Sequence, residues 1–242
     1  MNNIPLRSRK NQGYFLVTLL ALFFVSVLSS CKKDDDEMVS PDVSFITFIH
    51  SSPQYPATPL DFYIGGVRST SALMFTETSA RYTGTPYFGI YSGSYYIQVG
   101  LGGTTTQILA GNMDFKANET YSFFVTTKSP TIDSASAIIT TDNLSAPSTG
   151  KAKVRFVNVS RSATALDLAL QGGQALFTNK AYNSYTDFME VNPGSLTFQA
   201  KDTGTSNVRA TSSALNIEAG KIYTIWASGA TGAYELQMMV NK

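Results

Sequence analysis

Cysteine and histidine often serve as nucleophile and base in enzymes, and each occurs once in this chain, as Cys31 and His50. A serine triad needs a hydroxyl held against a histidine. Ser51 and Ser52 adjoin His50, but adjacent residues of a strand point to opposite faces. Zinc is equally unfavoured, because it usually takes several Cys or His ligands. The sequence therefore predicts no catalytic residue, no metal site and no cofactor.

The first thirty residues have the three zones of a secretory signal. Arg7, Arg9 and Lys10 form a basic cluster, residues 14–28 are almost wholly apolar, and small residues precede Cys31. The apolar run is shorter than the roughly 20 residues that a spanning helix needs. Residues 1–30 are therefore predicted to be a signal peptide.

The sequence Leu28-Ser29-Ser30-Cys31 closely resembles the bacterial lipobox. The resemblance implies cleavage before Cys31, diacylglycerol on its sulfur and acylation of its amine. A buried cysteine or a plain transmembrane anchor is the alternative. Several acyl chains would hold the protein firmly on a membrane.

Residues 31–42 are predicted to be a tether, since residues 32–37 are all charged. Cys-Lys-Lys-Asp-Asp-Asp-Glu also resembles the start of Bacteroidetes outer-membrane lipoproteins, in which an acidic run favours display on the cell surface. Because such a run would be a solvated tether in any case, display at the surface stays open.

Composition favours an exported β-protein. Three of the 18 Lys and Arg and none of the 17 Asp and Glu precede Cys31, so the mature chain has 15 against 17, a net charge of −2. Nucleic-acid binding is not expected, because it usually needs a basic face. Charged residues make up 14% of the chain and aromatic residues 12%. With a single cysteine, an apolar core must hold the fold without disulfides.

Alternation of apolar and polar residues predicts nine strands, separated by Gly, Pro, Asn and Ser clusters. They cover residues 44–50, 60–64, 95–99, 121–127, 154–159, 166–170, 196–200, 222–227 and 234–240. Short strands with regular turn signals indicate an all-β protein built from antiparallel β-sandwiches of the immunoglobulin or transthyretin type.

The two halves repeat the same features in the same order. Residues 59–66 parallel 165–173, and Ala117-Asn118-Glu119-Thr120-Tyr121 parallels Ala219-Gly220-Lys221-Ile222-Tyr223. Tyr82 and Phe88 correspond to Tyr182 and Phe188 at an offset of 100. We therefore expect one sandwich over 43–141, a linker over 142–150 and a second sandwich over 151–242.

The second half contains a series of short motifs: Val154-Arg155-Phe156-Val157-Asn158-Val159-Ser160, Leu166-Asp167-Leu168, Tyr182, Pro193-Gly194 and Ala219-Gly220-Lys221-Ile222-Tyr223-Thr224. In these motifs it is similar to the DUF4397 domain of bacterial secreted and lipid-anchored proteins. The first half departs from the pattern, with His50 at the position of Asn158. The resemblance implies sandwich domains and supplies no catalytic residues.

Some repeated polar residues have structural explanations. Asp61 and Asp167 are expected to accept hydrogen bonds from a turn or a neighbouring strand rather than to bind calcium, because neither has an acidic cluster nearby. Tyr121 and Tyr223 are expected to bond their hydroxyl groups to the backbone.

Residues 82–96 are unusually rich in tyrosine. Tyr82, Tyr87 and Tyr91 are candidate binding residues, because exposed aromatic side chains anchor ligands and interfaces. The alternative is that these rings lie in the core or in cross-strand pairs. Asp133-Ser134-Ala135 resembles an O-glycosylation site of Bacteroidetes exported proteins, which makes Ser134 a candidate for modification; an ordinary polar turn is the alternative.

These observations favour a non-enzymatic, lipid-anchored protein of the outer membrane that serves adhesion, binding or a structural role. A carbohydrate-binding accessory lipoprotein of a glycan-uptake system is the alternative, and a hydrolase is the third hypothesis. The expected partners are the membrane, through the lipid, and a glycan or a surface protein.

Overall fold

The computed structural model describes residues 42–161, 165–229 and 232–242. Within these ranges the only helix is a single turn, α2 (Ala80–Thr83), and the other regular elements are strands. The predicted signal peptide, Cys31 and the tether up to residue 41 lie outside the described residues. No helix in the described ranges has the length and apolar character needed to cross a bilayer.

The first half forms two four-stranded sheets, ordered β4-β1-β7-β8 and β3-β2-β5-β6. The strands are β1 (Val43–His50), β2 (Leu60–Ile64), β3 (Val67–Leu73), β4 (Phe88–Tyr91), β5 (Gly93–Leu101), β6 (Gln107–Phe115), β7 (Thr120–Ser129) and β8 (Ile132–Thr141). Apolar side chains from both sheets share one core, in which the rings of Phe48 and Phe62 stack with centroids 4.5 Å apart. The two sheets therefore form a sandwich.

The second half repeats this plan. The strands are β9 (Ala152–Asn158), β10 (Leu166–Leu170), β11 (Ala175–Lys180), β12 (Ser184–Tyr185), β13 (Met189–Val191), β14 (Gly194–Leu196), β15 (Phe198–Asp202), β16 (Val208–Thr211), β17 (Leu215–Ile217), β18 (Ile222–Ser228) and β19 (Glu235–Val240). One sheet has the order β12-β9-β18-β19, with β13 also paired to β9. The other has the order β11-β10-β15-β16, and β14 pairs with β17.

The predicted all-β sandwich architecture is confirmed. The nine predicted strands agree with observed strands to within two residues, although Thr197 divides the predicted strand over 196–200 between β14 and β15. Most strand pairs are antiparallel, but β1 pairs parallel with β7, and β9 pairs parallel with β18. Alternation of apolar and polar residues cannot reveal the direction of pairing, because it is the same in parallel and antiparallel strands.

The strand registers show that the halves are structural repeats. Ile46 lies opposite Tyr121 in the first repeat, and Val154 lies opposite Tyr223 in the second. Each of these tyrosine hydroxyls accepts a backbone N–H five residues upstream, at 3.1 Å in the first repeat and 2.9 Å in the second. The expectation of tyrosine hydroxyls bonded to the backbone is confirmed.

Asp61 and Asp167 stabilise equivalent bulges, in the β2–β3 pair and the β10–β11 pair. The carboxylate of Asp61 accepts the N–H of Ala72 at 2.7 Å, and that of Asp167 accepts the N–H of Asn179 at 2.7 Å. Both donor residues have positive φ, 53° and 55°, in the left-handed region that most residues avoid. The carboxylates thus stabilise a neighbouring strand, as the sequence analysis expected.

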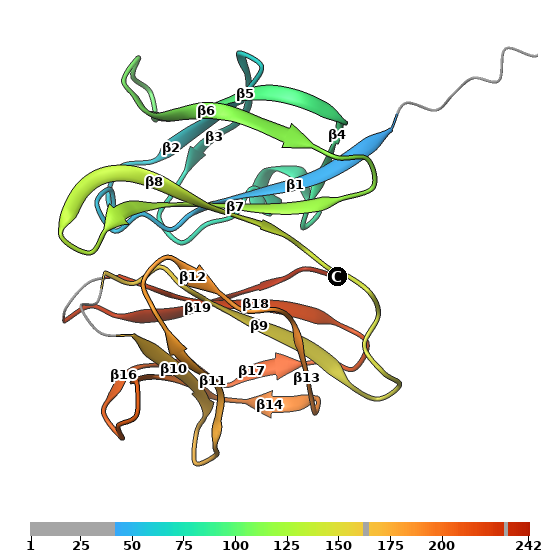
Figure 1. The fold of residues 1–242 in the computed structure, drawn as a ribbon, viewed down its shortest axis with the longest axis vertical. Helices are drawn as coiled ribbons and strands as arrows, with labels where there is room; N and C mark the ends of the chain where they lie inside the picture. The colour runs from blue at the N-terminus through green and yellow to red at the C-terminus, as the bar shows by residue number, and fades with distance from the viewer. Residues whose placement is uncertain (1–41, 162–164, 230–231) are drawn as a thin grey trace, which may run out of the picture. The chain divides into compact units, whose positions relative to one another are not determined.

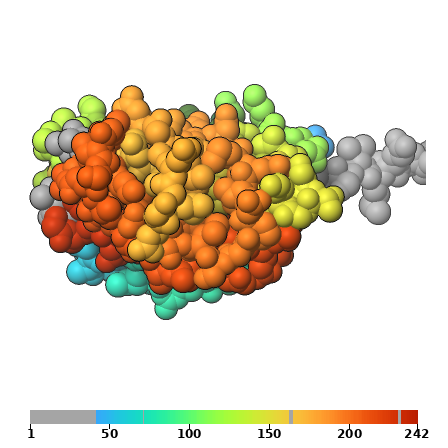
Figure 2. Space-filling view, turned by 90° about the horizontal axis from the view of Figure 1, so that it is seen from below, coloured from blue at the N-terminus to red at the C-terminus, as the bar shows by residue number. Residues whose placement is uncertain are grey.

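The two sandwiches also pack against each other, which places the four large sheets in successive layers (Figure 1). The sheet of β1, β7 and β8 faces the sheet of β9, β18 and β19. Buried apolar side chains from both form a third cluster, consisting of Ile49, Phe124, Ile138, Val157, Val159, Trp226 and Met239. Viewed from the side of the second repeat, the surface consists mainly of orange segments of that repeat (Figure 2).

His50 fixes the loop that follows β1. Its side chain is fully buried, and its Nε2 lies 3.2 Å from the carbonyl of Tyr55 and 3.1 Å from that of Thr58. Carbonyl groups only accept hydrogen bonds, so Nε2 carries the proton. Nδ1 is buried without a partner among the described residues. Burial lowers the pKa of His50 to about 4, although both carbonyl contacts oppose the shift.

We predict that His50 makes the protein less stable in mild acid. The pKa of His50 is about 4 in the folded protein, whereas its ordinary value, which applies to the unfolded chain, is 6.5. The contribution of neutral His50 to the free energy of unfolding is therefore fully present above pH 6.5. It is lost as the pH falls towards 4, and the total loss is about 3 kcal/mol. Urea unfolding at several pH values should show this slope. His50→Asn, which places the residue of the second repeat there, should reduce it, and an unchanged slope in that variant would contradict the assignment.

Candidate functional site

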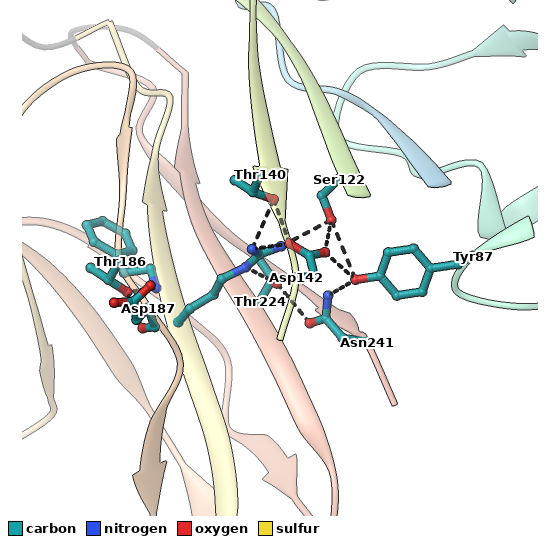
Figure 3. A network of polar contacts seen from close by, with 10 residues as sticks. Tyr87, Ser122, Thr140, Asp142, Thr186, Asp187, Thr224 and Asn241 are labelled. Carbon is teal, nitrogen blue, oxygen red and sulfur yellow. Dashed lines mark hydrogen bonds and ion pairs between the residues drawn. The ribbon is translucent and has the colours of Figure 1, made fainter. Parts of the chain in front are cut away.

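One end of the interface between the repeats is a buried polar network (Figure 3). Its centre is an ion pair between Arg155 of β9 and Asp142, which follows β8, with Nη1 and Oδ1 2.5 Å apart. Arg155 is 1% exposed and Asp142 5%. Asp142 lies in the predicted linker over 142–150. Nothing in the local sequence indicates that its carboxylate meets an arginine from the second repeat.

The guanidinium group of Arg155 is held by both repeats. Nε donates to Thr224 at 2.8 Å, Nη1 to Thr140 at 3.0 Å, and Nη2 to Ser122 at 3.1 Å. Its carbon also lies 4.6 Å from the centroid of the Phe188 ring. A planar cation with several fixed donors suits such a site better than an ammonium group would.

Asp142 is equally well satisfied. It accepts hydrogen bonds from Tyr87 at 2.6 Å and from Ser122 at 2.5 Å on Oδ2, and from Thr140 at 2.6 Å on Oδ1. Burial, reinforced by the charge of Asp142, raises the pKa of the Tyr87 hydroxyl. Tyr87 therefore stays protonated and acts as a donor to the carboxylate.

Equivalent positions from both repeats meet in this network. Asp142 follows β8 as Asn241 follows β19, and both contact the hydroxyl of Tyr87. Ser122 donates to Asp142, as Thr224 donates to Asn241 at 2.8 Å. Because its charges are paired and enclosed, the network joins the repeats and leaves little capacity for an external ligand.

The structure separates the predicted binding tyrosines. Tyr87 belongs to the internal network, whereas Tyr82 is 46% exposed and bonds the carbonyl of Ala72 at 3.0 Å. Tyr91 is 61% exposed at the end of β4. Ser134 is exposed within β8, where the sequence analysis had considered a turn. Cys31 lies outside the described residues.

A groove on the outer face of the sheet β3-β2-β5-β6 was not anticipated. It has a volume of about 230 Å³ and is lined by Tyr63 of β2, the amides of Gln98 and Gln107, Gly100, and threonines of the β5–β6 turn. The two amides are hydrogen-bonded at 2.7 Å. At Gly100 a side chain would come within 3.2 Å of the Thr106 carbonyl and 3.9 Å of the Tyr63 ring, so glycine keeps the floor open.

The groove is specific to the first repeat. By strand register, Ala169 corresponds to Tyr63, Lys201 to Gly100 and Val208 to Gln107. On the same face Tyr96, 47% exposed, lies opposite Asn112 in the neighbouring strand. Position-by-position comparison of the two repeats is the sequence signal that could have identified these residues.

The groove offers two kinds of contact. The Tyr63 ring presents an apolar surface beside two amides, and each amide provides both donors and an acceptor. Among the residues that the structure describes, no three His, Cys, Asp or Glu side chains are grouped so as to hold a metal ion. The residues that line the groove are uncharged, so it suits binding of an uncharged ligand with both apolar and hydrogen-bonding surfaces.

The family comparison agrees with the internal repeat. The model described as "Domain of unknown function (DUF4397)" matches residues 44–169 and again residues 169–242. The chain belongs to the DUF4397 family. The boundary at residue 169 falls within β10, whereas the sheets of the two repeats divide between β8 and β9.

Other comparisons give little further information. No curated protein matches the chain. Among solved structures, one similar chain is CBMbc of family CBM26 from Eubacterium rectale Amy13K, in complex with maltoheptaose. It is 11% identical, and the match covers 81% of this chain and 95% of that chain with a TM-score of 0.24. A TM-score this low carries no argument about the ligand of this DUF4397 protein.

We predict that Arg155→Met destabilises the protein by roughly 3–5 kcal/mol, because it leaves the buried Asp142 carboxylate without its cation. Urea unfolding measures the loss. Arg209→Met, which breaks the more exposed pair with Asp202, is the matched control and should cost clearly less. Adding Asp142→Leu to Arg155→Met should recover part of the loss. A near-native stability of Arg155→Met would show that the ion pair does not hold the repeats together.

Proposed function

We propose that this protein is a non-enzymatic binding module of the bacterial envelope, anchored to the outer membrane by lipid on Cys31 and displayed at the cell surface. The signal, the lipobox-like sequence and the charged residues 32–37 support the anchor and its location. Two sandwiches joined through a buried interface support a binding role, since rigid scaffolds hold a binding surface at low entropic cost.

The groove around Tyr63 is the observation that carries the binding role. The partly buried ring of Tyr63 beside Gln98 and Gln107 combines an apolar surface with paired donors and acceptors. Sugars have the complementary chemistry, because their rings have apolar C–H faces and hydroxyl edges. A neutral polysaccharide is therefore the ligand class that we assign to this face.

The difference between the repeats supports this assignment. The positions that hold the sandwich together keep their roles, as Tyr121 and Tyr223 do. The groove position differs between the repeats, with the partly buried Tyr63 in the first and Ala169, 1% exposed, in the second. The fold does not need a tyrosine there, so the ring is available for contact with a ligand.

The anchor is tested with Cys31→Ser. The native protein should fractionate with membranes and carry the added mass of the lipid. The variant should lack this mass and lose firm membrane attachment. Protease shaving of intact cells tests display, and full protection of the folded native protein would place it on the inner side of the outer membrane. Membrane attachment of the variant equal to that of the native protein would contradict lipid anchoring at Cys31.

Glycan binding is tested with the mature protein in a detergent that contains no sugar, using a glycan array and retardation in polysaccharide gels. Tyr63→Ala, which places the second repeat's residue in the groove, should weaken binding by about tenfold or more. Gln199→Ala on the corresponding face of the second repeat is the control and should leave binding unchanged. Binding of equal strength in Tyr63→Ala would exclude the groove as the site.

A further inference from the structure

The edge strand β8 has backbone groups that no neighbouring strand uses. It is the last strand of the sheet β4-β1-β7-β8 and pairs only with β7 (Figure 1). The N–H of Asp142, just after β8, donates to the Thr120 carbonyl at 2.7 Å, so every second residue before Asp142 faces β7 as well. The residues between them point their N–H and C=O groups away from the sheet. Within the part of the chain that the structure describes, no hydrogen bond uses these outward groups of Ala135, Ala137, Ile139 and Thr141.

An apolar crevice lies beside this edge, between β8 and β6 of the opposite sheet. Its volume is about 130 Å³, and Asn112 is the only polar side chain that lines it. Ile139 lies opposite the core residue Phe123 and points into the sandwich, yet it is 43% exposed. The core of the first sandwich therefore reaches the surface at this edge.

The second repeat fills the equivalent edge with its own side chains. By register, Leu236 of β19 corresponds to Ala137, and Tyr234, just before β19, corresponds to Ala135. Leu236 and Tyr234 pack against the second core, and the guanidinium carbon of Arg209 lies 5.8 Å from the centroid of the Tyr234 ring. Because the first repeat has alanine in both places, its crevice remains open.

The edge also lacks the features that usually prevent pairing with a second chain. Exposed edges commonly carry lysine, other charges or proline. Residues 134–141 contain no charged residue and no proline. Asp133, the one charged residue of β8, is paired with Arg161 at 2.5 Å. The equivalent edge strand β19, by contrast, begins with Glu235. Nothing along residues 134–141 therefore repels an added strand.

The edge is complementary to itself. In an antiparallel pair of two β8 strands centred on Ile138, Ala137 of each copy lies opposite Ile139 of the other, and Ala135 lies opposite Thr141. This register pairs all the outward N–H and C=O groups of both strands. It also places Ile139 of one copy beside the small Ala137 of the other, since opposite residues share a face. A large side chain thus covers the crevice from the second copy, as Leu236 does within the second repeat.

We propose that two copies of this protein associate through β8, which joins their β4-β1-β7-β8 sheets into one continuous sheet. A single pair of edge strands is a small contact compared with the roughly 1,200–2,000 Å² of stable interfaces, so the association is reversible. The groove around Tyr63 lies on the outer face of the other sheet and stays accessible. A dimer would therefore present two grooves to one polysaccharide chain, which increases avidity.

Sedimentation equilibrium of the mature protein, in a density-matched detergent with micelles in excess, measures the association. We expect a reversible equilibrium between monomer and dimer. Amide hydrogen exchange over residues 134–141 should become slower as the protein concentration rises, because the outward N–H groups become hydrogen-bonded in the dimer.

Two variants locate the contact. Ile139→Lys places two like charges near the centre of the strand pair. Ala137→Pro removes an N–H that points away from β7, where an edge strand tolerates proline. Each should raise the dissociation constant of the dimer at least tenfold. Val240→Lys, at a position of β19 that is 41% exposed, is the matched control and should dimerise like the native protein. Circular dichroism and urea unfolding confirm that each variant is folded.

The Tyr63→Ala variant separates this inference from the function proposed above, because it should dimerise like the native protein even if polysaccharide retardation is lost. Native protein that stays monomeric at the highest attainable concentration would overturn the proposal. Native affinity between copies of folded Ile139→Lys and Ala137→Pro would also overturn it, and so would a dimer in which exchange over residues 134–141 is unchanged.

Discussion

The arrangement of this protein depends on the packing of two sheets, one from each repeat, through faces that an isolated sandwich would expose to water. The first strand of each repeat, β1 or β9, contributes apolar side chains to the core of its own sandwich. At other positions the same strands contribute side chains to this interface. The centre of the interface is apolar, as Phe124 and Trp226 show, and one end is closed by Arg155 and Asp142. Burying a charge pair is costly unless every lone pair and proton is used, which explains the hydroxyl groups around it.

Face-to-face packing also accounts for the distribution of the repeated residues. Ser122 and Thr224 occupy equivalent positions and lie in the same network, so the interface brings like positions of a duplicated chain together. Symmetry is broken at the position that is Thr47 in the first repeat and Arg155 in the second. A second arginine opposite the first would place two like charges in a buried site, which is strongly unfavourable.

Duplication allows the two copies to take different roles on a shared framework. The tyrosine hydroxyls bonded to the backbone and the aspartates at the bulges are the same in both repeats, because each sandwich needs them to close its turns and edges. The outer groove has Tyr63 in the first repeat and Ala169 in the second. In the apolar interface, Trp226 of the second repeat corresponds to Phe124 of the first. The candidate binding groove thus lies where the copies differ.

The sequence by itself determined the sandwich class, the repeat and the central strands. β1, β2, β5 and β7 were all predicted, because central strands carry a dense pattern of apolar residues. The edge strands of the first repeat, β3, β4, β6 and β8, were missed, since edges carry more polar and small residues and their alternation is weak. The tertiary structure alone decided the parallel pairs, the Arg155–Asp142 contact and the inward direction of Tyr87. Those features join residues far apart in the chain, and local periodicity contains no information about which distant face a side chain will meet.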